Sequence, residues 1–261
     1  MPALDLPLLI DAARIAGRVA TSYTGPAAQC WDKPDGAGPV TEADLAVNDV
    51  LLSNLRTARP DYGWLSEETE DDDTRLSHET VFIIDPIDGT RSFIEGGKTW
   101  AISIAVAHQG QVTAAAVYLP MRDMLYTASL GGGATLNDAP LRTLNSPLSP
   151  DTTVLAAKPN LNAVHWKGSP PEIDRQYRPS LAYRLSLVGA GKFDAMLTLR
   201  PSWEWDIAAG ALIVSEAGGI ISDRTGAHLR FNNAHPTLNG VIAGGRAVHS
   251  ALVDLIGPAP S

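Results

Sequence analysis

The residues of this chain best suited to chemistry stand in one short segment, Asp85-Pro86-Ile87-Asp88-Gly89-Thr90-Arg91-Ser92-Phe93. It directly follows the apolar run 81–84, which has the composition and length of a buried strand. Because Pro86 has no backbone N–H, we expect it to end that strand after Asp85 and to fix the following turn. Asp88 can then lie beside Asp85, which places two carboxylates at the mouth of a strand.

An oxygen-rich corner of this kind is typical of a metal and phosphate site. Paired carboxylates suit Mg²⁺, which proteins usually hold with one or two acids plus substrate phosphate. Gly89 and Thr90 add backbone N–H groups at a predicted helix start, where phosphate oxygens can bind. For a bare Asp-x-x-Asp pair the alternative is an Asx-turn followed by a helix cap, which needs no ligand.

Ordered segments along the chain together resemble the inositol monophosphatase family, the lithium-sensitive, Mg²⁺-dependent phosphomonoesterases. These segments are Val40-Thr41-Glu42-Ala43-Asp44, Ser66-Glu67-Glu68, Asp85 to Phe93, and Trp205-Asp206-Ile207-Ala208-Ala209-Gly210. The third is similar to the metal-binding signature of the family, and the fourth is similar to its second signature. The resemblance covers most of the chain and implies a phosphoric monoester hydrolase.

The resemblance also implies the fold, which is of the α/β (α+β) class. We expect a layered α/β/α/β/α sandwich of the inositol monophosphatase and sugar phosphatase type, forming a single domain over residues 1–261. Its antiparallel-rich subdomain would span about 1–150 and its mixed subdomain 151–261. The family further leads us to expect a homodimer.

Local patterns predict elements that agree with such a sandwich. Apolar residues at helical spacing predict a first helix around 8–19 and a second one that opens at Thr41. Alternating strands over 101–128 predict an antiparallel meander that ends in a flexible triple-glycine hairpin. After residue 151, helices and strands alternate, and we expect 160–179 to be an exposed loop.

The resemblance implies which residues would hold metal. Glu67, Asp85 and the backbone carbonyl of Ile87 would hold a first Mg²⁺, and Asp85, Asp88 and Asp206 would hold a second. Glu67 would also help to place a weaker third ion, and Mn²⁺ could substitute. Two ions on either side of a bridging carboxylate suit in-line displacement at phosphorus.

The catalytic pair implied by the resemblance is Asp44 and Thr90. A threonine hydroxyl is a weak base, so Asp44 would finally accept the proton of the attacking water. The local sequence leaves other roles open, because Thr41 and Asp44 match a capping box. In the same way, Asp206 before an alanine-rich run can be an ordinary helix N-cap, and both roles can coexist.

Residues outside the metal centre must select the substrate. Asp88, Gly89 and Thr90 would bind the scissile phosphate, while Arg184 and Arg200 suit a second phosphate through bidentate pairing. Lys158 could add to that basic patch, although arginines and lysines are mostly surface residues. Together with the segment Ser180-Leu181-Ala182-Tyr183-Arg184, this pattern is more similar to the 3′(2′),5′-bisphosphate nucleotidase branch of the family, whose substrate would be 3′-phosphoadenosine 5′-phosphate. Inositol-1-phosphate and histidinol phosphate are the alternatives.

Composition limits the binding partners, the cellular location and the cysteine chemistry that can be expected of this chain. The chain has 261 residues with 44% hydrophobic content, and its net charge of −9 argues against binding to a nucleic acid polymer. No apolar run reaches the length of a membrane span, so the cytoplasm is the expected location. Cys30 is the only cysteine, which excludes an intrachain disulfide, and we expect it to be at least half-buried.

A non-enzymatic role remains a separate hypothesis. Phosphatase-fold proteins can act by docking to partner proteins, and the acidic run 70–73 offers a contact surface, although such runs are usually solvated loops. Loss of hydrolysis on replacement of Asp85 would leave a docking role intact, which separates the two hypotheses.

Overall fold

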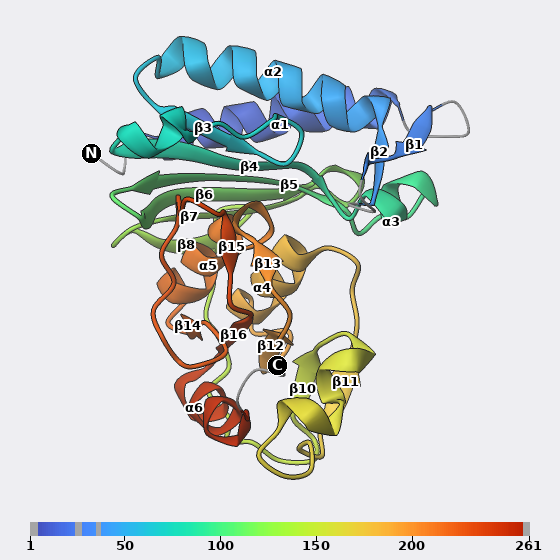
Figure 1. The fold of residues 1–261 in the computed structure, drawn as a ribbon, viewed down its shortest axis with the longest axis vertical. Helices are drawn as coiled ribbons and strands as arrows, with labels where there is room; N and C mark the ends of the chain where they lie inside the picture. The colour runs from blue at the N-terminus through green and yellow to red at the C-terminus, as the bar shows by residue number, and fades with distance from the viewer. Residues whose placement is uncertain (1–4, 24–27, 35–37, 258–261) are drawn as a thin grey trace.

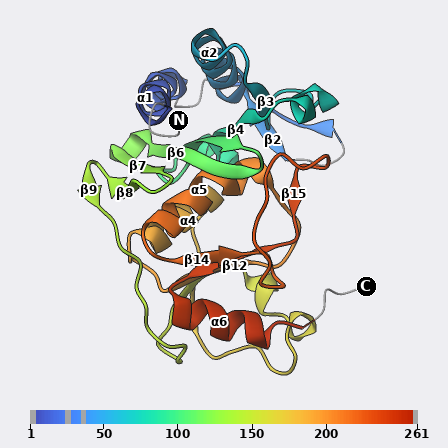
Figure 2. The ribbon, with the colours of Figure 1, turned by 90° about the vertical axis from the view of Figure 1, so that its left-hand side faces the viewer.

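The chain folds into stacked layers of helices and sheets, seen from two directions in Figures 1 and 2. The structure is a computed structural model and describes residues 5–23, 28–34 and 38–257. Helices α1 (Leu6–Ser22) and α2 (Glu42–Ala58) cover one face of a seven-stranded sheet. Helices α4 (Leu181–Gly189) and α5 (Glu204–Glu216) lie between this sheet and a five-stranded one, and α6 (Arg246–Leu255) covers the far side. The predicted layered α/β sandwich is confirmed.

The large sheet carries the first half of the chain in the order β3-β4-β5-β6-β7-β8-β9. Its strands are β3 (Gly63–Ser66), β4 (Thr80–Asp88), β5 (Ala101–His108), β6 (Gln111–Leu119), β7 (Met124–Ser129), β8 (Gly133–Leu136) and β9 (Ala139–Pro140). Only β3 and β4 pair in parallel, so the expected antiparallel meander is present. Its triple-glycine hairpin is tied down, because the Glu216 carboxylate accepts hydrogen bonds from the N–H groups of Gly131 and Gly133 at 2.9 and 2.8 Å.

The small sheet is mixed and runs in the order β11-β10-β12-β16-β14. Its strands are β11 (Asp174–Gln176), β10 (Thr153–Leu155), β12 (Ala195–Thr198), β16 (Val241–Gly244) and β14 (Ile220–Ser222). Two short pairs stand apart from both sheets: β1 (Cys30–Asp32) with β2 (Pro39–Thr41), and β13 (Ser202–Trp203) with β15 (Thr237–Leu238). In the described part of the chain, no helix is both long and apolar enough to span a bilayer.

Three local expectations were wrong. The strand does not stop at Pro86: β4 continues to Asp88, because Pro86 lies in a shift of register between Asp85 and Asp88, where its missing N–H breaks no ladder bond. The segment 160–179 is not simply an exposed loop, since it contributes β11 and the buried Trp166. Cys30 is exposed, because its strand β1 pairs only with β2 at the edge of the molecule.

The two central helices approach each other through a glycine. A Cβ built on Gly210 of α5 would lie 2.5 Å from Cβ of Leu185 in α4, a separation that real side chains do not adopt. Helix α5 is buried on nearly every face, since it lies between both sheets and against α4. The glycine of the Trp205 segment therefore serves helix packing, and the close packing fixes where the start of α5 lies.

We expect Gly210→Ala to destabilise the fold by about 1 to 3 kcal/mol, because the added methyl group overpacks a closed helix contact. Thermal and chemical denaturation would measure the change. Gly168→Ala is the matched control, since Gly168 is exposed and an added Cβ there meets no atom within 4 Å. Equal stability of the two variants would contradict the packing role.

Candidate active site

Three carboxylates from distant parts of the chain meet between the large sheet and helix α5. Asp85, Asp88 and Asp206 each place one carboxylate oxygen within 4.8 Å of the others. Asp85 and Asp88 come from the end of β4, whereas Asp206 lies in the first turn of α5. Asp206 is not the N-cap of that helix, because the helix already begins at Glu204 and Trp203 occupies the cap position. We call Asp85, Asp88 and Asp206 the acidic trio.

The backbone after β4 turns sharply enough to bring both aspartates to one place. The N–H of Ile87 donates to Oδ1 of Asp85 at 3.0 Å, which closes a tight turn over Pro86. Gly89 has a φ of 99°, a left-handed conformation that residues with a side chain rarely adopt. It allows helix α3 (Thr90–Ile94) to start directly after Asp88. The turn that positions Asp85 and Asp88 therefore favours a glycine at position 89, directly before Thr90.

Asp88 is held by the start of helix α4. Its Oδ2 accepts hydrogen bonds from Ser180 Oγ and from the N–H of Ala182, both at 2.6 Å. Ser180 also caps α4 through the N–H of Tyr183 at 2.9 Å. One Asp88 oxygen is thus engaged, and the carboxylate orientation is set by a helix from the other half of the chain.

Replacing Ser180 with alanine should weaken both the helix and the metal site. We expect a loss of about 1 kcal/mol from the missing cap and about 10-fold to 100-fold weaker Mg²⁺ binding from loss of the group that orients Asp88. Titration calorimetry with Mg²⁺ and urea denaturation would measure the two effects. Ser186→Ala is the control, because its buried hydroxyl donates to Ala182 O within the same helix. A loss of Mg²⁺ affinity equal to that in the Ser186 variant would contradict this role.

Asp44 has the capping role that its local sequence indicated, and it also contacts Thr90. Its Oδ2 accepts from the N–H of Thr41 at 2.9 Å, and the Thr41 hydroxyl caps helix α2, so the capping box is present. Its Oδ1 accepts from Thr90 Oγ1 at 3.3 Å, and the same hydroxyl lies 3.2 Å from the Ile87 carbonyl oxygen. The cap anchors Asp44 at a helix start, and its second oxygen reaches the Gly-Thr step.

Glu67 lies at the edge of the same cavity but outside the acidic trio. Its Oε1 is 2.8 Å from Lys33 Nζ, and Oε1 of Glu68 is 2.7 Å from the same nitrogen. No local pattern marks Lys33 as part of the site, because only the fold brings the residue after β1 next to the residues after β3. The ammonium group balances two neighbouring carboxylates in a region that is strongly acidic.

Burial governs the protonation of the acidic residues. Desolvation, together with the charges of Glu67 and Asp88, raises the pKa of Asp85 well above its usual range. Desolvation and the neighbouring Asp88 do the same for Asp206. Burial raises the pKa of Asp88 and of Asp44 to about 6, against hydrogen bonds that lower it. Buried like charges of this density favour either protons or a bound cation.

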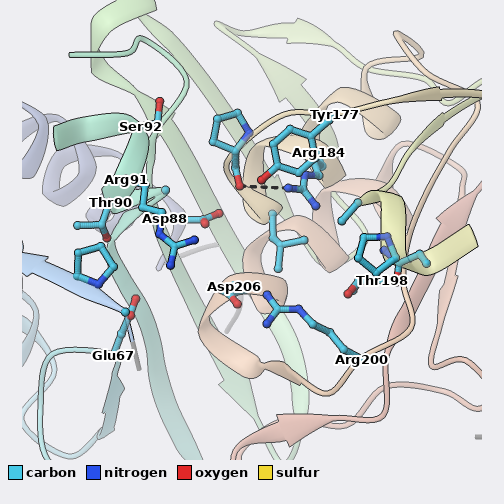
Figure 3. A pocket seen from close by; sticks show the side chains of 18 of the residues that line it. Glu67, Asp88, Thr90, Arg91, Ser92, Tyr177, Arg184, Thr198, Arg200 and Asp206 are labelled. Atoms are coloured by element: carbon cyan, nitrogen blue, oxygen red, sulfur yellow. Dashed lines mark hydrogen bonds between the residues drawn. The ribbon is translucent and has the colours of Figure 1, made fainter. Parts of the chain in front are cut away.

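Asp88 and Asp206 of the acidic trio line a cavity of about 600 Å³, whereas Asp85 is not among its lining residues (Figure 3). Glu67, Asp88, Gly89, Thr90 and Asp206 line it, as do Arg91, Arg184 and Arg200. Figure 3 shows Glu67 and Thr90 on one side and Thr198 at the opposite end, with Arg200 directed toward Asp206. Lys158 is exposed and is not among the lining residues, so it does not extend the basic patch.

A hydrogen-bonded latch formed by Arg75, Asn232, Asn233 and Glu204 holds the start of α5. Glu204 is fully buried, and its carboxylate accepts from the N–H of Asn232 at 2.6 Å and of Asn233 at 2.9 Å. Arg75, also buried, donates to Asn232 Oδ1 at 2.6 Å and to the Asn233 carbonyl at 2.9 Å. This latch ties the first turn of α5, and so Asp206, to the segment before β4.

Sequence comparison decides the family of this fold and site. The model of the inositol monophosphatase family matches residues 5–257. The chain belongs to the inositol monophosphatase family. It is a phosphomonoester hydrolase of that family, whose members are generally Mg²⁺-dependent. The acidic trio fits such an ion, because buried carboxylate oxygens are the donors that a hard divalent cation prefers.

Relatives in the family carry different names. The chain is 34% identical to an inositol-1-monophosphatase of Mesorhizobium japonicum over 96% of its length and 95% of that protein. It is 35% identical to the Nus factor SuhB of Salmonella typhimurium, with the same coverage of each chain. It also superposes on the solved structure described as 2′AMP bound SaIMPase-II, with a TM-score of 0.78, 25% identity, and coverage of 95% of this chain and 91% of that chain.

Proposed function

We propose that this phosphatase is a 3′(2′),5′-bisphosphate nucleotidase, which converts 3′-phosphoadenosine 5′-phosphate to AMP and phosphate. The observation that carries the proposal is the charge distribution of one cavity, in which Arg184 and Arg200 line the space that continues from the acidic trio. Beyond Glu67, Asp88 and Asp206, the described residues that line it include no other acid. Guanidinium groups suit a second phosphate, and a solved relative with 2′AMP bound is consistent with a nucleotide substrate.

The chain's own residues have defined parts in this reaction. Asp85, Asp88 and Asp206 would hold Mg²⁺, with Glu67 and the Ile87 carbonyl as further oxygen ligands and Mn²⁺ as a possible substitute. When bound, two such ions supply an activated water and neutralise charge on the phosphate and the leaving oxygen. Thr90 Oγ1 donates to Asp44, so a proton taken by the hydroxyl can pass to the Asp44 carboxylate.

Substrate placement follows from the same cavity. The N–H groups of Gly89 and Thr90 would donate to the scissile phosphate beside the acids. Arg184 and Arg200 would hold the second phosphate, and the cavity volume leaves room for the nucleoside between them.

A phosphomonoester panel tests the proposal. Phosphate release from 3′-phosphoadenosine 5′-phosphate, inositol-1-phosphate and histidinol phosphate would be measured with Mg²⁺, with chelator, and with added Li⁺. We expect the bisphosphate to have the highest kcat/KM, with activity lost in chelator and inhibited by Li⁺. Far faster turnover of inositol-1-phosphate would refute the nucleotidase proposal.

Replacing Arg200 with methionine should separate the substrates. Because a hydrogen bond to a charged group contributes about 1.5 to 3 kcal/mol, KM for the bisphosphate should rise about 10-fold to 100-fold. The kcat/KM for inositol-1-phosphate should change little, since that substrate has no second phosphate. Lys158→Met is the control, because Lys158 does not line the cavity. Equal losses with both substrates would assign Arg200 to the scissile phosphate instead.

Hydrolysis of inositol-1-phosphate is the second candidate, and the name of the Mesorhizobium relative favours it. The name of the Salmonella relative, a Nus factor, keeps a partner-docking role open as a third candidate. The panel separates the first two. A docking role would persist in an Asp85→Asn variant that no longer hydrolyses any ester.

A further inference from the structure

The residue before Arg200 is held by side chains rather than by the sheet. Strand β12 pairs with β16 only as far as Thr198, so the backbone N–H and carbonyl of Leu199 lie outside the ladder. The N–H donates to Oδ1 of Asn160 at 2.9 Å, and the carbonyl accepts from Nη1 of Arg224 at 2.9 Å. Two side chains from distant parts of the chain therefore fix both backbone groups of one residue. We call Asn160 and Arg224 the Leu199 clamp.

Both members of the clamp are buried, and both are anchored themselves. Asn160 is 7% exposed, and its carbonyl accepts from Trp166 Nε1 at 3.0 Å. Arg224 is 4% exposed, and its backbone N–H donates to the Asn239 carbonyl at 3.1 Å. The clamp thus holds Leu199 against two segments that have fixed positions of their own.

Arg224 carries a buried charge without an ion-pair partner in the described part of the chain. Besides its bond to the Leu199 carbonyl, its guanidinium lies 3.5 Å from the Gly257 carbonyl oxygen. Burial of a charge among neutral acceptors contributes little to net stability. What this guanidinium holds, the end of strand β12, therefore explains its position better than a gain in folding free energy does.

The side chain of Arg200 has no comparable anchor. Its guanidinium makes no hydrogen bond or ion pair with the residues that the structure describes, yet it is directed toward Asp206 in the cavity (Figure 3). A long side chain without a partner keeps several rotamers, so the position of its backbone decides which part of the cavity the guanidinium reaches. That backbone position is set one residue earlier, at Leu199.

We propose that Asn160 and Arg224 are positioning residues for substrate selection, which aim Arg200 at the second phosphate of a bisphosphate by clamping Leu199. The inference rests on the proposed function, in which Arg200 holds that phosphate. Arg224 is not among the residues that line the cavity, so it acts on the substrate through the chain that it holds rather than by contact. Release of the clamp should therefore raise KM for the bisphosphate and leave the chemistry at the acidic trio unchanged.

Arg224→Met tests the clamp, because it keeps a buried stem and removes the donors to the Leu199 carbonyl. We expect KM for 3′-phosphoadenosine 5′-phosphate to rise about 3-fold to 10-fold through misplacement of the Arg200 guanidinium, while its kcat and the kcat/KM for inositol-1-phosphate stay within about 2-fold of the parent. Arg224→Lys retains the charge and one donor, so it should recover most of the lost affinity. Arg175→Met is the matched control, since Arg175 donates to the Ala156 carbonyl at 3.0 Å, outside the chain that leads into Arg200.

A double-mutant cycle separates positioning from a general defect. In the Arg200→Met background, Arg224→Met should raise KM for the bisphosphate by less than about 2-fold, because the guanidinium that the clamp aims is already absent. Asn160→Leu removes the acceptor for the Leu199 N–H, and it should show the same split between substrates and the same non-additivity. This second variant carries the test if Arg224→Met does not fold.

The outcomes distinguish the clamp from the proposed function. Additive losses in the cycle, equal losses with both substrates, or an unchanged KM for the bisphosphate in both clamp variants would overturn the clamp and leave bisphosphate hydrolysis standing. If the bisphosphate is not hydrolysed, the proposed function fails. The same cycle with inositol-1-phosphate then decides the clamp, since non-additive losses in Arg200→Met and Arg224→Met support it, and additive losses or none overturn it.

Discussion

Replacing Asp85 with asparagine is expected to lower kcat about 10³-fold while raising the thermal midpoint of the metal-free protein. The loss of activity follows because a neutral amide removes the charge that would bridge two ions and fix them against the phosphate. The gain in stability follows from burial. The pKa of Asp85 is raised above its unfolded value by desolvation and by neighbouring carboxylates, so its ionisation destabilises the fold at every pH above about 4.

Steady-state kinetics at saturating Mg²⁺ and thermal melts in chelator would measure the two effects in one variant. Asp49→Asn is the matched control, because Asp49 is exposed on helix α2 and should change neither quantity. An Asp85→Asn protein that stays within 10-fold of full activity would refute the metal role. One that melts earlier than the parent in chelator would refute the electrostatic account.

Mg²⁺ should stabilise the natural chain strongly, and more so at pH 8 than at pH 5.5. A ligand at 100 times its dissociation constant contributes about 2.7 kcal/mol, which corresponds to a rise of roughly 5 to 10 °C in a domain of this size. The pH dependence follows from competition. The carboxyls of Asp85 and Asp206 have raised pKa values, and burial raises that of Asp88 to about 6, so protons occupy the site as pH falls.

The direction of the pH effect on stability can be checked in the metal-free protein. A carboxyl whose folded pKa is raised is most favourable to folding when protonated, so metal-free stability should fall as pH rises from about 4 through the raised values. Melts in chelator and in Mg²⁺ should therefore diverge with rising pH. Asp206→Asn should abolish most of this divergence, and Asp254→Asn on helix α6 should preserve it. Parallel curves would contradict metal binding by the acidic trio.

Local patterns predicted the parts of this molecule whose structure depends on nearby residues. The capping box at Thr41 begins α2, and helices and strands alternate after residue 151 as the sequence indicated. Asp85 and Asp88 could also be named as ligand candidates from their own segment, because paired carboxylates beside a Gly-Thr step need no tertiary information, whereas Glu67 and Asp206 were named through the resemblance to a family. The structure brings Asp85, Asp88 and Asp206 together, and their roles as ligands remain a proposal.

Long-range contacts account for what the sequence could not show. Ser180 reaches Asp88 across 92 residues, and Lys33 reaches Glu67 across 34. No local pattern marks such partners, since each is an ordinary cap or surface residue until the sheets pack against α4 and α5. Asn160 was placed in an exposed loop for the same reason: only the fold brings its side chain to the N–H of Leu199. The continuation of β4 through Pro86 likewise depends on a neighbouring strand that tolerates the shift in register.

The latch at the start of α5 constrains how the chain can change length. The segment 230–236 is almost devoid of regular structure, yet its amides are fastened to Glu204 and its carbonyls to Arg75. An extra residue there would pull those bonds out of register and tilt the helix that carries Asp206. Insertions and deletions among descendants of this chain should therefore collect elsewhere, for example around the exposed Gly168, where an added Cβ meets no atom within 4 Å.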